Sequence, residues 1–153
     1  MPTPIFLLDT NVALALLRGK ELGQYLLSAF SLDNQINRPL ISIVSHGELL
    51  VLADRNEWGH QKLEAMHKML DNLVAVDLND DAVLDAYAAV QRDSRKVEGG
   101  SRELNANDAW IIACARAADA TLLTMDRDFV HLKSPSWKVQ FIDPKPYLTT
   151  FGQ

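Results

Sequence analysis

Short apolar runs of three to five residues recur along this chain and alternate with longer stretches of helical periodicity. The runs expected to form strands are residues 5–8, 40–44, 74–76, 121–124 and 139–142. Short apolar runs bounded by polar residues are typical of buried strands. Their alternation with helices predicts a parallel sheet joined by right-handed crossovers. The expected fold class is α/β, with a central parallel sheet of four to five strands in a single domain over residues 1–153.

The helical stretches are marked by apolar spacing and by capping residues. Thr10 is expected to cap the first helix, and Ser45 is expected to cap a helix that carries Glu48. Asn79 or Asp80 opens a helix that reaches about residue 97. Further helices are expected over residues 20–30, 58–73 and 106–118, with a loop at 98–105.

Acidic residues stand where such a sheet would bring them together. Asp9 ends the first apolar run, and Asp126 and Asp128 follow the fourth run. Glu48 and Asp108 each lie near the start of an expected helix. Open α/β folds place their ligands at the carboxyl edge of the sheet, so these acids would share one crevice if the first strand is central.

Carboxylates gathered in one crevice repel one another and raise each other's pKa unless a cation neutralises them. A divalent metal is the expected cation, and an all-oxygen set without His or Cys suits Mg²⁺ or Mn²⁺. Each acid also has an ordinary structural interpretation. Asp9 could cap a helix, Glu48 could complete a capping box with Ser45, and Asp108 could be a first-turn acid. Asp128 could be a metal ligand or the cap of a short turn.

The overall charge limits the possible partners. The formal charge is −5, so no global positive field attracts nucleic acid, and any such binding must use a local basic patch. The single cysteine, Cys114, excludes an intramolecular disulfide and is expected to be a small core residue.

No apolar run approaches the roughly 20 residues that span a bilayer, and the start lacks the basic region of a signal peptide. A cytoplasmic location without membrane contact is expected.

Four motifs carry a resemblance to a known family. They are Leu7-Leu8-Asp9-Thr10-Asn11, Ser45-x-x-Glu48-Leu49, Asn107-Asp108-Ala109-x-Ile111-Ile112-Ala113 and Leu123-Thr124-x-Asp126-x-Asp128-Phe129. The set resembles the PIN-domain ribonucleases, and most of all the VapC-type toxins of toxin–antitoxin modules. The resemblance runs from about residue 5 to 142 in the family's order. One departure is Ser45-His46-Gly47 ahead of Glu48, where Thr and a larger apolar residue are common.

The resemblance implies a three-layer α/β/α fold and Mg²⁺- or Mn²⁺-dependent cleavage of RNA, either transfer or ribosomal. It also implies a homodimer and a small antitoxin partner. The implied catalytic residues are Asp9, Glu48, Asp108 and Asp126, and the implied metal ligands are Asp9, Asp108, Asp126 and Asp128. Asn11 and Thr124 match polar positions that hold these carboxylates in place.

A basic cluster precedes the helix of Asp108 and consists of Arg92, Arg95, Lys96 and Arg102. It could steer a phosphate backbone, or it could be the ordinary charge of an exposed helix end.

Three other functions fit parts of the sequence. A catalytically silent PIN-like module that binds RNA or protein would be indicated by loss of an acid, and none is missing. A haloacid-dehalogenase-type phosphatase needs a second Asp two residues after the first, where this chain has Asn11. A flap-endonuclease-type DNA nuclease would be larger and more basic.

Overall fold

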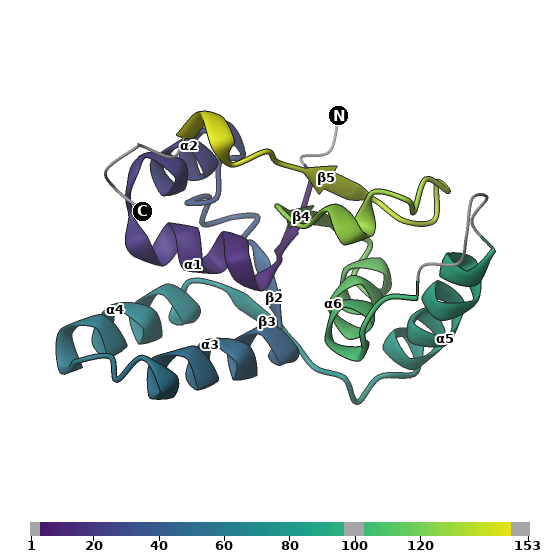
Figure 1. Ribbon diagram of the computed structural model, residues 1–153, viewed down its shortest axis with the longest axis horizontal. Coiled ribbons are helices and arrows are strands. Elements are labelled where there is room, and N and C mark those ends of the chain that lie inside the picture. Colours follow the sequence, from purple (N-terminus) through teal and green to yellow (C-terminus); the bar gives the residue numbers. More distant parts are fainter. Residues whose placement is uncertain (1–3, 97–102, 148–153) are drawn as a thin grey trace.

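The computed structural model describes residues 4–96 and 103–147, and it contains one sheet of five parallel strands (Figure 1). The strands are β1 (Phe6–Leu8), β2 (Leu40–Ser42), β3 (Val74–Val76), β4 (Thr121–Thr124) and β5 (Val139–Phe141). Their order across the sheet is β3-β2-β1-β4-β5, and every neighbouring pair is parallel. The expected α/β class with a central parallel sheet is confirmed.

Helices cover both faces of this sheet. They are α1 (Thr10–Arg18), α2 (Glu21–Ala29), α3 (Ile43–Arg55), α4 (His60–Asp71), α5 (Asp81–Arg95) and α6 (Ala106–Ala117), with short 3-10 turns η1 (Arg127–Phe129) and η2 (Lys145–Tyr147). In Figure 1, α5 and α6 lie on one side of the strands and α1 to α4 on the other. The result is the three-layer α/β/α arrangement. Among the described residues, no helix is both long and apolar enough to cross a membrane.

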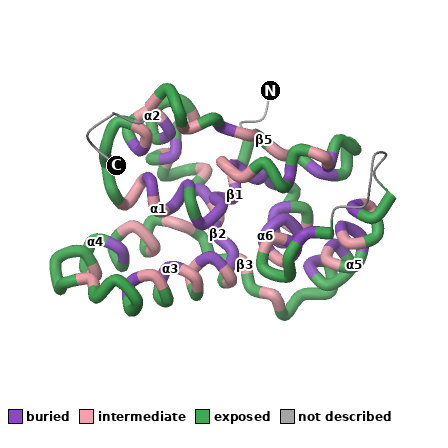
Figure 2. Tube along the Cα trace, viewed as in Figure 1, coloured by how far each residue is buried: buried purple, intermediate pink, exposed green. Residues whose placement is uncertain are grey.

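Strand residues alternate between two cores, which explains why the strands are so short and so apolar. Leu7 and Leu122 pack in a cluster with α5 and α6, whereas Leu8 and Leu123 pack with α1 and α2. All four side chains are completely buried, and Figure 2 shows buried residues on the central strands and on the inner faces of the helices. The edge strands β3 and β5 have no buried residue. A parallel sheet covered on both faces needs apolar residues at every position.

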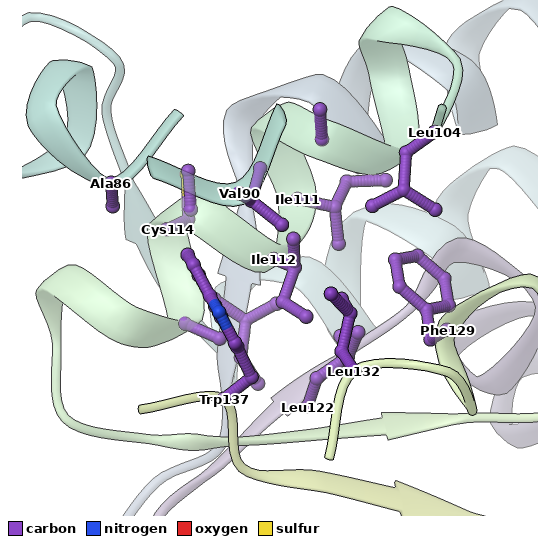
Figure 3. Packing of buried hydrophobic residues seen from close by; sticks show 14 of the residues in the cluster. Ala86, Val90, Leu104, Ile111, Ile112, Cys114, Leu122, Phe129, Leu132 and Trp137 are labelled. Carbon is purple, nitrogen blue, oxygen red and sulfur yellow. The ribbon is translucent and has the colours of Figure 1, made fainter. Parts of the chain in front are cut away.

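The larger core also fixes a turn that carries an acid. Figure 3 shows Phe129, Leu132 and Trp137 against Ile112 and Leu122, which come from α6 and β4. Phe129 ends η1 and is fully buried, and burying such a ring contributes about 2 kcal/mol. The preceding residue in η1 is therefore held at a defined place after β4.

The first helix begins one residue differently from the sequence interpretation. Asp9, and not Thr10, is the N-cap, so the capping interpretation of Asp9 is confirmed, and its Oδ1 accepts a hydrogen bond from the Thr10 backbone N–H at 2.8 Å. Aspartate is a better N-cap than threonine, so α1 is capped by Asp9 and Thr10 becomes its first helical residue.

The predicted capping box at Ser45 is wrong. The cap of α3 is Ser42, whose Oγ accepts from the backbone N–H of Val44 at 3.1 Å. Strand β2 therefore ends two residues before the predicted boundary. The apolar run 40–44 continues through the first helical turn, so periodicity alone could not separate strand from helix. Ser45 is buried inside the helix and is free for another role.

Two glycines give opposite predictions for the same substitution. A Cβ added at Gly23 in α2 would lie 2.3 Å from the carbonyl oxygen of Ala15 in α1, whereas a Cβ at Gly47 in α3 would meet nothing within 4 Å. We expect Gly23→Ala to destabilise the fold by about 2–3 kcal/mol, because two helix backbones must move apart. Gly47→Ala should stabilise by about 0.5–1 kcal/mol through helix propensity. Urea unfolding of both variants and of the wild type checks this pair. If Gly23→Ala were as stable as the wild type, α1 and α2 would not approach as closely as described.

Candidate active site

The central position of β1 brings the carboxyl ends of three strands together. Leu8 pairs with Ile41 of β2 on one side and with Leu123 of β4 on the other. The Asp9 backbone N–H then donates to the Leu123 carbonyl at 3.0 Å. The residues after β1 and β4 therefore lie at one edge of the sheet, which the order of strands along the chain could not establish.

A pocket of about 700 Å³ opens at this edge, and four acids line it. They come from four different elements: Asp9 follows β1, Glu48 lies in α3, Asp108 lies in the first turn of α6, and Asp126 follows β4. The structure thus brings the four acids expected to be catalytic into one cavity.

Asp9 is the most enclosed of these acids, with 5% of its surface exposed. Its Oδ1 caps α1, and its Oδ2 accepts a hydrogen bond from the Thr124 hydroxyl at 2.7 Å. Burial raises the pKa of Asp9, and the charges of Asp126 and Glu48 raise it further, against the lowering effect of the two hydrogen bonds. Each oxygen keeps a second lone pair, so both could still bind a cation.

Glu48 is held by residues from two other elements. The Thr10 hydroxyl donates to Glu48 Oε1 at 2.7 Å and also lies 2.9 Å from the Ser45 hydroxyl. The Asn107 amide donates to Glu48 Oε2 over a longer distance of 3.5 Å. Thr10 and Ser45, which sequence reasoning used as helix caps, therefore position this acid. Their contact joins α1 to α3 at the pocket wall.

Asp108 is positioned by the cap of its own helix. Asn105 caps α6, accepts from the Asp108 backbone N–H at 2.8 Å and donates its side-chain amide to Asp108 Oδ2 at 2.9 Å. Burial raises the pKa of Asp108 to about 7, and the charges of Asp9, Asp126, Asp128 and Glu48 contribute in the same direction. A carboxyl group with this pKa marks a site where negative charge is not compensated by the protein itself.

Asp126 and Asp128 complete the cluster from the turn after β4. Asp126 caps η1 by accepting from the Asp128 backbone N–H at 2.8 Å, and its own N–H donates to the Thr124 hydroxyl at 3.0 Å. Asp128 therefore lies inside η1 and does not cap it. Carboxylate oxygens of Asp108, Asp126 and Asp128 lie within 4.8 Å of one another.

This donor set fits a small divalent cation. All the candidate ligand atoms are carboxylate oxygens, which Mg²⁺ and Mn²⁺ prefer. A bound cation would also offset the repulsion from the neighbouring acids, which adds to burial in raising the pKa of Asp108. Asp9 is near enough to act on Asp108 by charge but lies outside the group of three.

The two residues expected to support the acids differ in their contacts. Thr124 bridges the ends of β1 and β4, because it donates to Asp9 and accepts from the Asp126 N–H. Asn11 lines the pocket, yet within the described part of the chain it forms no hydrogen bond with the carboxylates. Asn105 and Asn107 contact them instead. Asn107 stands directly before Asp108 in the sequence, and Asn105 stands at the Asn-x-x-Asp spacing of a helix cap.

The described members of the basic cluster, Arg92, Arg95 and Lys96, do not line the acidic pocket. Arg92 and Arg95 lie exposed in the last turn of α5, and Arg95 pairs with Glu103 at 3.8 Å. Lys96 lines a different cavity of about 440 Å³, and Arg102 lies outside the described residues. Their role in binding substrate stays a prediction. The only cation among the described residues that line the pocket is Arg55, in the last turn of α3.

Comparison with known proteins places this arrangement in a class. The PIN domain profile matches residues 6–134. A search of curated proteins finds no match. VapBC-1 from nontypeable Haemophilus influenzae is similar in structure, with a TM-score of 0.72 and 20% identity over 90% of this chain and 97% of that one. FitAcB from Neisseria gonorrhoeae has a TM-score of 0.61 and 25% identity, again over 90% and 97%.

A third solved structure covers 92% of this chain and all of its own, with 21% identity and a TM-score of 0.62. It is VapBC-5 from Mycobacterium tuberculosis, described as a member of the VapBC family of toxin–antitoxin systems. The parallel sheet and the acids at its carboxyl edge agree with the matched profile, which belongs to a family of nucleases. The chain belongs to the PIN domain family.

Proposed function

We propose that this protein is a Mg²⁺- or Mn²⁺-dependent endoribonuclease and the toxin of a toxin–antitoxin module. The observation that carries the proposal is the convergence of Asp9, Glu48, Asp108 and Asp126 in one pocket, with Asp128 beside them. Membership of a nuclease family and the resemblance of the motifs to VapC-type toxins support it.

The roles of the residues follow from their contacts. Asp108, Asp126 and Asp128 would hold the cation, and Asp9 is fixed close by through its two hydrogen bonds. A divalent ion bound there would lower the pKa of a coordinated water and offset the charge that grows on the phosphoryl oxygens. Glu48 faces the same space from α3, held by Thr10. Because water is the nucleophile, the products should carry 5′-phosphate and 3′-hydroxyl ends.

Cleavage assays with defined RNA test this function directly. We expect the purified protein to cut a mixture of transfer and ribosomal RNA with Mg²⁺ or Mn²⁺ and to lose this activity in EDTA. Ca²⁺ should support cleavage poorly, because it does not keep the octahedral geometry of a Mg²⁺ site. A ligase that requires a 5′-phosphate shows whether the RNA products carry that group. Cleavage that continues unchanged in EDTA, or that leaves cyclic phosphates, would reject the metal-dependent reaction.

The proposed partners are a second copy of the chain and a small antitoxin. The VapBC structures similar in fold support the antitoxin, as does an apolar cavity of about 230 Å³ between α1, α2 and α4. The second copy of the chain is implied by the resemblance of the motifs to VapC-type toxins. Its walls include Leu16, Leu27, Met69 and Leu73, and Leu27 is 40% exposed. Such a groove suits the apolar face of a partner helix. An Arg or Lys of the partner could enter the acidic pocket and occupy the charge site.

Co-purification from the native operon tests the partners. We expect a small protein to copurify, the complex to contain two copies of this chain by light scattering, and overexpression of this chain alone to stop growth. A harmless monomer that retains no small protein would reject the toxin role, whereas the nuclease activity would be judged by the cleavage assay.

A further inference from the structure

One wall of the acidic pocket is formed by a single face of α3. The lining residues of this helix are Val44, Gly47, Glu48, Val51, Leu52 and Arg55. Their spacing of three and four residues places them in one row along the helix. We call this row the α3 wall. Within this row Glu48 is one of the pocket acids, and Val51, Leu52 and Arg55 follow it towards the end of the helix.

The middle of the α3 wall is open and apolar. Gly47 presents no side chain, and a Cβ there would meet no atom within 4 Å. Its backbone does not require glycine, since its φ is not positive, and glycine weakens a helix relative to alanine. Val51 follows one turn later and is 49% exposed. The wall thus offers an exposed apolar surface next to a highly charged site, where an ordinary solvated helix would carry polar groups.

The far end of the α3 wall carries a positive charge. Arg55 lies seven residues after Glu48, which corresponds to about 10 Å along the helix. Among the described residues it has no carboxylate within ion-pair distance, although four acids line the same pocket. Arg18 is a useful comparison, because it also lies in the last turn of a helix but does not line this pocket. The helix dipole favours both arginines equally.

We propose that the α3 wall binds the nucleotide next to the cleaved phosphodiester of a single-stranded RNA, with its base over Gly47 and Val51 and its phosphate on Arg55. The inference rests on the proposed ribonuclease function and deepens it. A base can lie on an apolar helix face only when it is unstacked, so duplex RNA does not fit. Arginine is suited to a phosphate through its planar fork of donors. One cation at the edge of an acidic pocket orients the strand without neutralising the site that must hold metal.

RNA binding separates this inference from the cleavage reaction. The probe is a fluorescein-labelled random-sequence single-stranded RNA decamer, and anisotropy is measured with Mg²⁺ over a range of salt concentrations. Each substitution is made in an Asp126→Asn background, so that the probe stays intact. Arg55→Ala should weaken binding about five- to tenfold at low salt and reduce the slope of log K against log salt by about 0.7, the value for one phosphate contact on a single strand. Arg18→Ala, the matched control, should change neither.

The open part of the wall has its own pair of variants. Gly47→Leu should weaken binding about tenfold by occupying the space of the base, with the salt slope unchanged. Gly47→Ala should bind nearly as the parent does. A duplex RNA of the same length should bind more weakly than the single strand and should not respond to either Gly47 substitution.

The outcomes distinguish the two proposals. If the wild type cleaves RNA but Arg55→Ala binds the probe with the parental affinity and slope, the α3 wall is not the subsite and the ribonuclease function stands. If Arg55→Ala weakens binding with the expected change of slope while the wild type cleaves nothing, the ribonuclease function fails, and the α3 wall is an RNA-binding surface but not a subsite for cleavage. If Arg55→Ala loses only a copurifying protein, the wall is a protein-binding surface and the inference is overturned. Melting curves of each variant confirm folding.

Discussion

Asp126→Asn should reduce kcat/KM for RNA cleavage at least about 1000-fold while the protein stays folded. Stabilisation of transition-state charge by a metal is worth several kcal/mol, and about 4 kcal/mol corresponds to a factor of about 1000. Asparagine is nearly isosteric with aspartate and can keep the hydrogen bond from the Asp128 N–H. The substitution therefore removes charge and leaves the turn after β4 intact. Asp9→Asn and Asp108→Asn should have losses of similar size for the same reason.

Stability measurements show whether these losses come from chemistry or from unfolding. Asp108→Asn should raise the melting temperature of the metal-free protein at pH 8, because it removes a charge from a repulsive cluster. Asp85→Asn on the exposed side of α5 is the matched control, and it should alter neither cleavage nor melting. Full activity of any of the three pocket variants would remove that residue from the catalytic set.

The fold was predictable because its strands have an unusual composition. The runs that became β1 and β4 are short apolar segments at the centre of the sheet, where burial on both faces requires this pattern. The edge strands β3 and β5 have no buried residue, and they were recognised from their short runs of Val, Ala and Phe residues. The boundary after β2 was not predictable, because Ile43 and Val44 continue the apolar run into the first turn of α3. The change is marked by the Ser42 cap, a local hydrogen bond to the Val44 N–H, and Ser45 is an equally suitable capping residue three positions later.

The acids were predictable from their places after strands and at helix starts, but their neighbours were not. Thr10 meets Glu48 across 38 residues of sequence, and Asn107 meets the same side chain across 59 residues. Such contacts depend on β1 lying between β2 and β4, which sequence order does not determine. Thr10 and Ser45 were therefore assigned to helix caps, the commonest local role of these residue types.

Arg55 illustrates a different reason for a missed residue. Its spacing of seven from Glu48 places both on one helix face, so the sequence contains the information. The spacing carries weight only once the helix is known to extend unbroken from residue 43 to residue 55 and to line the pocket. The basic residues predicted to bind substrate were those before Asp108 in the sequence. The described members of that basic cluster lie at the end of α5 and not on α3.

Metal binding should depend steeply on pH between about 5.5 and 7. The pKa of Asp108 is raised to about 7 in the metal-free protein, from an ordinary value of 3.8, first by burial and then by the neighbouring acids. A cation binds the carboxylate form, so binding below pH 7 must release the proton. One released proton weakens the apparent affinity about tenfold per pH unit. The Kd for Mn²⁺ should therefore be about thirtyfold larger at pH 5.5 than well above pH 7.

The same shift predicts the pH dependence of metal-free stability. A carboxyl group whose pKa is higher in the folded state binds more protons folded than unfolded between pH 3.8 and about 7. The free energy of unfolding therefore falls as pH rises through this window and becomes level above it. Asp9, whose pKa is also raised, acts in the same direction. Saturating Mn²⁺ should reverse the trend, since a ligand bound only by the folded state adds stability that grows with its affinity.

Titration of Mn²⁺ by electron paramagnetic resonance at several pH values measures this linkage, and proton release at pH 6 can be followed in a weakly buffered solution. Asp108→Asn should bind Mn²⁺ more weakly at every pH, and its affinity should vary much less between pH 5.5 and 7.5, because the group that titrates in this range is gone. Asp85→Asn should keep the full dependence. An affinity for Mn²⁺ that is the same at pH 5.5 and 7.5 in the wild type would show that Asp108 does not bind the ion or that its carboxyl group is already ionised at pH 5.5. If Asp108 does not bind the ion, Asp108→Asn should keep both its affinity for Mn²⁺ and its cleavage activity. If the Asp108 carboxyl group is already ionised at pH 5.5, Asp108→Asn should still lose both.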